Sequence, residues 1–214
     1  LLFHWLIVQL FYLSKNPDAV KNATRAMLKG LKKDDNNSAV EEFLGVRSDV
    51  VIANNKVALS EYNSNKMAKA ANLFAESYSI DTLNRYSYFM VGKCTIAAGD
   101  TAEGEVYYRN LIHLYNDDLT ADNNTGEKEI DPHTYFINKF WEGGKLDSAK
   151  IMIADGRAIF GNNAKLNFYH KKVTLEQIKN IPPSNLMLEY VQEVLQFSPA
   201  DKDLLQKENS IYIF

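Results

Sequence analysis

Residues 85–115, RYSYFMVGKCTIAAGDTAEGEVYYRNLIHLY, predict two antiparallel helices joined at Gly99-Asp100. Gly99 suits a left-handed turn between helices, and Gly104 would let the two helices approach closely. A step of 34 residues relates this stretch to residues 51–81, where small and aromatic residues recur in phase. The matched positions are Ala58 with Gly92, Asn65 with Gly99, Ala70 with Gly104, Phe74 with Tyr108, and Asp81 with Tyr115. Such a repeat predicts stacked helix pairs, at 51–62 with 66–80 and at 85–98 with 101–115.

The pattern continues toward the C-terminus after an interruption. Residues 117–131, DDLTADNNTGEKEID, are acidic and polar and predict a loop inserted into the array. The repeat then resumes 45 residues after its predecessor, with Gly144, Ala149 and Ile153 in the places of Gly99, Gly104 and Tyr108. Two further helices are predicted at 166–180 and 184–197. A short polar helix at 198–207 would close the exposed end of the array.

The first fifty residues fit the repeat less well. Residues 1–14 and 17–33 predict a helix pair, and residues 39–47 predict a short extra helix or an offset half-repeat. The run LLFHWLIVQLFYL at the start is apolar, but its thirteen residues are fewer than the ~20 needed to span a bilayer. We interpret this run as a buried repeat helix. The alternatives are a membrane-proximal remnant or an interface, and membrane association would come only through this run or through sequence upstream of it.

Composition narrows the class of function. The chain has 214 residues, of which 46% are hydrophobic, so it can bury a substantial core. The 24 basic and 27 acidic residues nearly balance, which is not typical of a nucleic-acid-binding protein. Cys94 is the single cysteine, so no internal disulfide or thiolate metal cluster can form. A soluble domain is expected, and both the cytoplasm and a bacterial envelope fit this composition.

The unit with Gly92, Gly99-Asp100, Gly104 and Tyr108 resembles the tetratricopeptide repeat family, which has small residues, an interhelix turn and an aromatic residue at these places. The resemblance covers residues 51–201, whereas residues 1–50 would be degenerate N-terminal helices and residues 198–214 a C-terminal capping helix and tail. The family's Trp at the fourth position is absent from every unit, and Asn54 stands there in the first clear one. The resemblance implies an all-α fold: one domain, 1–214, forming a right-handed superhelix of stacked antiparallel helix pairs.

Members of this family bind an extended peptide or a partner helix in a concave groove lined by the first helix of each pair. The resemblance places on that groove Asn55, Leu59, Tyr62, Tyr86, Phe89, Lys93, Ile96, Thr134, Asn138, Trp141, Lys172 and Glu176. Tyr86, Phe89 and Trp141 would be rigid anchors. Lys93 and Asn138 would hold a peptide backbone or an acid. The alternative for each ring is that it fills the seam between repeats.

No arrangement of residues typical of catalysis is found in the sequence. His4, His113, His133 and His170 are scattered without metal-ligand spacing, and neither a phosphate-binding glycine loop nor a nucleophile motif is present. We therefore expect no enzyme activity, no metal and no cofactor. The leading hypothesis is a non-catalytic protein–protein interaction scaffold. The alternatives are an envelope-associated carbohydrate-binding or assembly protein built on helix pairs, and an enzyme assembled from distant residues.

Overall fold

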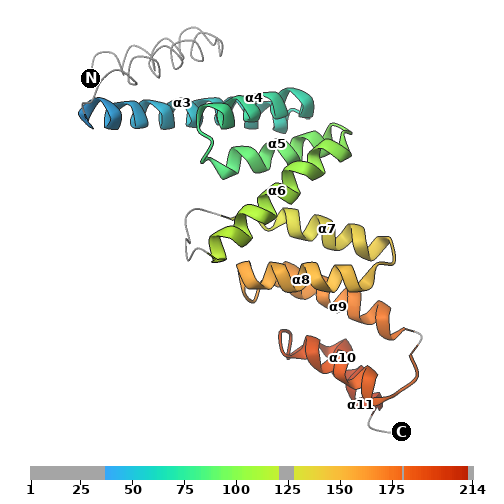
Figure 1. Ribbon diagram of the computed structural model, residues 1–214. Helices are drawn as coiled ribbons and strands as arrows, with labels where there is room; N and C mark the ends of the chain where they lie inside the picture. Colours follow the sequence, from blue (N-terminus) through green and yellow to red (C-terminus); the bar gives the residue numbers. More distant parts are fainter. Residues whose placement is uncertain (1–36, 121–127, 180, 212–214) are drawn as a thin grey trace. The chain divides into compact units, whose positions relative to one another are not determined.

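The computed structural model describes residues 37–120, 128–179 and 181–211 (Figure 1). Within these ranges every regular element is a helix and no strand is present, so the predicted all-α class is confirmed. The predicted helix pair at 1–14 and 17–33 lies outside the described residues, as do residues 121–127 of the predicted loop. The chain divides into two compact units. Unit 1 comprises residues 1–111 and 125–128, and unit 2 comprises residues 112–124 and 129–214.

Consecutive helices pack against one another in both units. Unit 1 contains α3 (Asn37–Asn63), α4 (Met67–Ile80), α5 (Arg85–Ala97) and the first half of α6 (Thr101–Thr120). Unit 2 contains the rest of α6, followed by α7 (Asp131–Glu142), α8 (Leu146–Phe160), α9 (Ala164–Ile178), α10 (Asn185–Leu195) and α11 (Lys202–Ile211). In unit 1, α4 packs on both α3 and α5. In unit 2, α8 packs on α7 and α9, α10 packs on α9 and α11, and α7 also contacts α9.

Three of the helix boundaries that differ from those predicted have a clear cause. Residues 39–47 and 51–62 belong to one continuous helix, α3, because no Gly or Pro stands between them to end it. For the same reason α6 continues past Tyr115 to Thr120, into the predicted loop. The last helix begins at Lys202 rather than Ser198, because the Asp201 carboxylate accepts hydrogen bonds from the backbone N–H groups that open the first turn.

The three turns that repeat in the sequence have the same backbone conformation. Asn65, Gly99 and Gly144 have positive φ angles of 59°, 102° and 70°. Their N–H groups donate to the carbonyls three residues earlier, at 2.9, 3.0 and 3.0 Å. The next N–H groups, of Lys66, Asp100 and Lys145, donate to the carbonyls five residues earlier, at 2.9, 3.1 and 2.8 Å. This is the Schellman pattern, so the predicted left-handed turn at Gly99 is confirmed. The turns at Asn65 and Gly144, which match Gly99 in the sequence, have the same pattern.

Helices α5 and α6 meet at two glycines. A Cβ added to Gly104 would lie 2.5 Å from Cγ1 of Ile96 and 2.8 Å from the carbonyl oxygen of Gly92. A Cβ added to Gly92 would lie 2.9 Å from Cβ of Tyr107. Real Cβ atoms essentially never come so close, so only glycine allows this approach. The predicted close approach at Gly104 is therefore confirmed.

Asn54, which departs from the family pattern, ties α3 to α4. Its buried Nδ2 donates to the carbonyl oxygen of Leu73 at 2.8 Å and to Oγ of Ser77 at 2.9 Å. A short amide can reach both acceptors across the helix pair, whereas the ring of a tryptophan has a single N–H donor. The helix pair is thus joined here by hydrogen bonds rather than by a large apolar side chain.

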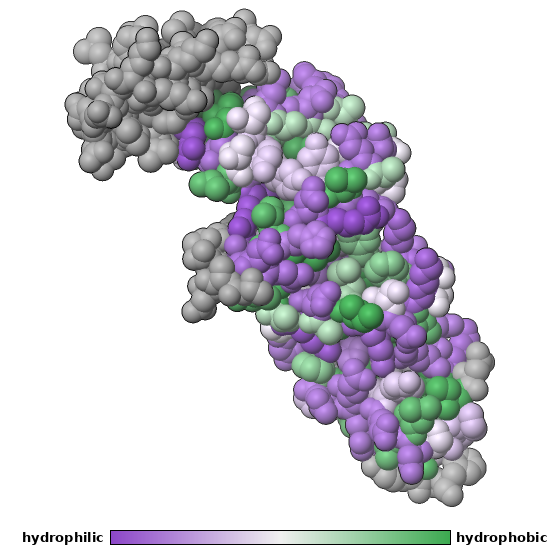
Figure 2. Space-filling model, viewed as in Figure 1, coloured by the Kyte–Doolittle hydropathy of each residue, from purple (hydrophilic) through white to green (hydrophobic). Residues whose placement is uncertain are grey.

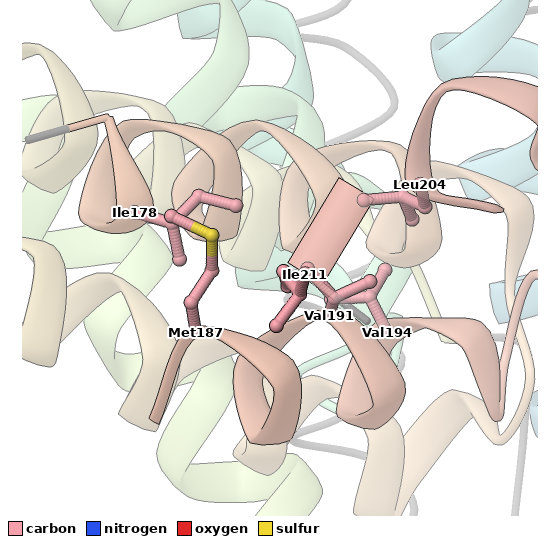
Figure 3. Close-up of a cluster of buried hydrophobic side chains, with 6 residues drawn as sticks. All are labelled: Ile178, Met187, Val191, Val194, Leu204 and Ile211. Carbon is pink, nitrogen blue, oxygen red and sulfur yellow. The ribbon is translucent and has the colours of Figure 1, made fainter. Parts of the chain in front are cut away.

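Unit 2 has two apolar clusters. The first lies between α7, α8 and α9 and contains Ile137, Ala149, Ile153, Leu166 and Val173. The second lies between α9, α10 and α11 and contains Ile178, Met187, Val191, Val194, Leu204 and Ile211 (Figure 3). Helix α9 contributes to both clusters and therefore uses two of its faces for packing. A third face of α9 is left for other contacts.

Candidate functional site

The predicted groove residues of unit 1 come from α3 and α5, which are linked by hydrogen bonds. The side chain of Asn55 bonds to Oγ of Ser87 through its Nδ2 at 3.0 Å and through its Oδ1 at 3.1 Å. Leu59 and Tyr62, farther along α3, are half-buried. The first helices of successive pairs therefore contact each other in this unit, and Asn55 serves this contact.

Phe89 is a core residue, which corrects its predicted role as a rigid anchor in the groove. Its side chain is only 2% exposed, and its ring stacks on Tyr108 of α6 with centroids 6.0 Å apart. The glycine contact between α5 and α6 brings Tyr108 onto it. Lys93 covers the same ring, with Nζ 5.3 Å from the centroid. Of the predicted aromatic residues in unit 1, Tyr86 alone is exposed.

Two predicted groove residues lie on α7 of unit 2. Thr134 is 9% exposed, and its Oγ1 donates to the carbonyl oxygen of Asp131 at 3.1 Å. It therefore contributes to the first turn of the helix instead of to a binding surface, which is a second correction. Asn138 is half-buried, and its Nδ2 donates to Oε1 of Glu142 at 2.7 Å. This bond orients the amide along the helix.

Trp141 of α7 and Lys172 of α9 lie together, as the resemblance implies for groove residues. Nζ of Lys172 lies 3.9 Å from the centroid of the Trp141 ring system, 5.1 Å from that of Phe168 and 5.9 Å from that of Tyr169. We call these four residues the Trp141 cluster. Phe168 is 56% exposed. Trp141 and Tyr169 are half-buried and pack against the first apolar cluster. The Trp141 cluster therefore combines a positive charge with one exposed aromatic ring.

The sequence reasoning missed Phe168 and Tyr169, although a local signal was available. Residues three and four positions apart lie on the same face of a helix, so Phe168 and Tyr169 had to accompany Lys172 on its side of α9. On the face that Figure 2 shows, hydrophobic residues form small patches among hydrophilic ones. In unit 2, the exposed ring of Phe168 lies beside Lys172.

A polar cluster that the sequence analysis also missed joins α8, α9 and α10. Nε2 of His170 lies 3.1 Å from Oε1 of Glu193, and Nζ of Lys150 lies 3.4 Å from Oε2 of the same carboxylate. The guanidinium of Arg157 stacks on the ring of Phe197 at 3.4 Å. Burial lowers the pKa of His170 to about 4, with a further lowering by the nearby charge of Arg157. Because His170 is almost completely buried, we assign the cluster to helix packing.

His133 is fully buried in unit 2, and neither ring nitrogen has a hydrogen-bond partner among the residues that the structure describes. Its ring meets the edge of Phe160, with centroids 5.5 Å apart. Burial alone lowers the pKa of His133 to about 4, so the imidazole is neutral at neutral pH. Burial also raises the pKa of the Cys94 thiol to about 11, which leaves little thiolate for nucleophilic chemistry.

The described residues contain neither a metal site nor a membrane-spanning helix. In the ranges 37–120, 128–179 and 181–211, no three side chains of His, Cys, Asp or Glu lie together in a way that could hold a metal ion. No helix of the same ranges is both long and apolar enough to cross a membrane.

No protein-family model matches the sequence, and no curated protein matches it significantly.

Proposed function

We propose that this chain is a non-catalytic protein-interaction scaffold that binds a peptide or partner helix on the face of unit 2 formed by α7 and α9. The observation that carries the proposal is the Trp141 cluster, in which Lys172 lies over Trp141 and Phe168 is 56% exposed. A right-handed superhelix of tetratricopeptide-like helix pairs is part of the same proposal. The shared turns at Asn65, Gly99 and Gly144 support it.

Trp141 and Tyr169 partly serve packing, whereas the exposed ring of Phe168 suits binding. Aromatic side chains offer a large rigid surface that loses little conformational entropy when a partner covers it, and they dominate the binding energy of many interfaces. Phe168 has such a surface free, because α9 uses its other faces for the two apolar clusters of unit 2. Asn138 lies one turn before Trp141 on α7 and could hydrogen-bond a peptide backbone.

A selection from a library of short displayed random peptides tests this function. The purified full chain should enrich a set of related peptides. Replacing both Trp141 and Phe168 by alanine should weaken their binding by at least ~2 kcal/mol, or about thirtyfold, if the rings are hot spots. Ile151→Ala is the matched control, because Ile151 is an equally exposed apolar residue (63%) on α8 of the same unit.

Circular dichroism of each variant checks that the helical signal is retained. Unchanged peptide binding by a folded Trp141→Ala, Phe168→Ala double variant would move the site elsewhere. A chain that selects no peptide but binds immobilised glycans would support the carbohydrate-binding alternative, since aromatic rings also stack on sugars.

A further inference from the structure

We propose that Lys172 makes this surface selective for an acidic partner, a peptide segment in which a carboxylate stands beside a large apolar side chain. The inference depends on the proposed binding function of the α7–α9 face and specifies the chemistry of its ligand. It follows from the way in which Lys172 differs from the neighbouring lysines.

Helix α9 and the residue that caps it carry four lysines, at positions 165, 171, 172 and 179. Three of them pair with a carboxylate: Lys165 with Asp131 at 2.9 Å, Lys171 with Asp201 and Asp203 at 2.9 and 2.8 Å, and Lys179 with Glu176 at 3.4 Å. Lys172 is the exception. Its ammonium lies over the ring of Trp141 and forms no ion pair with any residue that the structure describes.

The nearest carboxylates along the two helices already have other partners. Glu176 lies one turn after Lys172, within reach of an ordinary pair on the helix surface, yet it bonds to Lys179. On α7, Glu142 accepts the hydrogen bond from Asn138. The α7–α9 face therefore carries a positive charge without a counter-ion from its own neighbours.

A ring contact holds an ammonium group without using all its hydrogen-bonding capacity. The attraction comes from the negative face of the aromatic ring, whereas each of the three N–H groups can still donate to an acceptor. An incoming carboxylate would receive charge-assisted hydrogen bonds from Lys172. Because Trp141 already restricts the lysine, less side-chain entropy would be lost on binding than for a freely moving lysine.

Charge alone would give little affinity at a solvated surface. The exposed ring of Phe168, 5.1 Å from the same ammonium, supplies the apolar contact that would make the interaction specific. The partner that fits both features has Asp or Glu within one or two residues of a large apolar residue. A purely acidic or a purely apolar segment would use half of the surface.

The peptides selected by the full-length chain test the inference. Wild-type selections should be enriched in Asp or Glu next to an apolar residue. For such a peptide, Lys172→Met should weaken binding about tenfold or more, because methionine keeps an apolar stem against Trp141 but removes the charge. Lys172→Arg should bind nearly as wild type. Lys165→Met is the matched control on the same helix and should leave binding unchanged.

A second comparison ties the loss to the carboxylate. Replacing the acidic residue of the peptide by its amide should weaken binding to the wild-type chain as much as Lys172→Met does, and should have no further effect on that variant. If no peptide is enriched, the proposed function itself fails. If peptides are enriched without acidic residues, or if they bind Lys172→Met and wild type equally, the binding function stands and the acidic specificity is wrong.

Discussion

Replacing Gly104 by alanine tests the close approach of α5 and α6. The added Cβ would lie 2.5 Å from Cγ1 of Ile96, 2.8 Å from the carbonyl oxygen of Gly92 and 2.9 Å from the backbone N of Ile96. A rotamer change can move the first atom, but the other two belong to the backbone, so the helices must separate. Overpacking of this kind costs about 1–3 kcal/mol, and the backbone contacts place Gly104→Ala at the upper end.

The intrinsic preference of a helix for alanine offsets part of this cost. Alanine is favoured over glycine in a helix interior by about 1 kcal/mol, so the net loss expected for Gly104→Ala is about 2 kcal/mol. Gly45→Ala is the matched control, because a Cβ at that exposed position of α3 would meet no atom of the described residues within 4 Å. The control should gain about 0.5–1 kcal/mol. The same substitution is therefore expected to lower the free energy of unfolding at position 104 and to raise it at position 45.

Urea unfolding of the purified chain, followed by circular dichroism, measures both effects. Gly104→Ala should lower the free energy of unfolding relative to wild type and Gly45→Ala should raise it, and the larger Gly104→Leu should act like Gly104→Ala but more strongly. If Gly104→Ala proves as stable as wild type, the two helices do not approach closely at this residue, and the steric argument is refuted.

Two further predictions concern buried polar groups. Because burial lowers the pKa of His133 to about 4, the neutral ring stabilises the fold fully above about pH 6.5, and about 3 kcal/mol is lost as the pH falls to about 4. Urea unfolding at pH 6.5 and at pH 4 measures this loss. Between the two pH values, the free energy of unfolding of His133→Leu should fall by about 3 kcal/mol less than that of the wild type. An equal fall in both proteins would contradict the lowered pKa of His133. Asn54→Ala should cost about 1–3 kcal/mol because Leu73 and Ser77 lose a buried donor, whereas Asn72→Ala, on the exposed face of α4, should change the unfolding midpoint little.

The helices and their turns could be predicted from the sequence because their signals are local. Glycine at positions 99 and 144 favours the left-handed turn, and the structure has that turn at both. Helix ends were predicted wrongly where no Gly or Pro is present to end the helix. Residues 48–50 contain neither Gly nor Pro, so α3 continues through them.

The candidate site could be predicted only in part. The resemblance placed Trp141 and Lys172 on a common face, and the structure brings them within 3.9 Å. Phe89 had the same kind of signal, an aromatic residue at helical spacing, but it belongs to the core. Spacing cannot separate an anchor from a core ring, because both recur on one side of a helix. The stacking of Tyr108 on Phe89, which depends on how closely α6 approaches α5, decided the difference.

The sequence by itself determined where helices form, where the chain turns and which small residues permit close packing, since each of these depends on residues a few positions apart. Only the tertiary structure decided which ionisable side chains pair with one another. Lys172 has Glu176 one turn away but lies over Trp141, which is far from it in the sequence. The position of Lys172 over Trp141 depends on the packing of α7 against α9, because only this packing brings the ring within reach of the ammonium group.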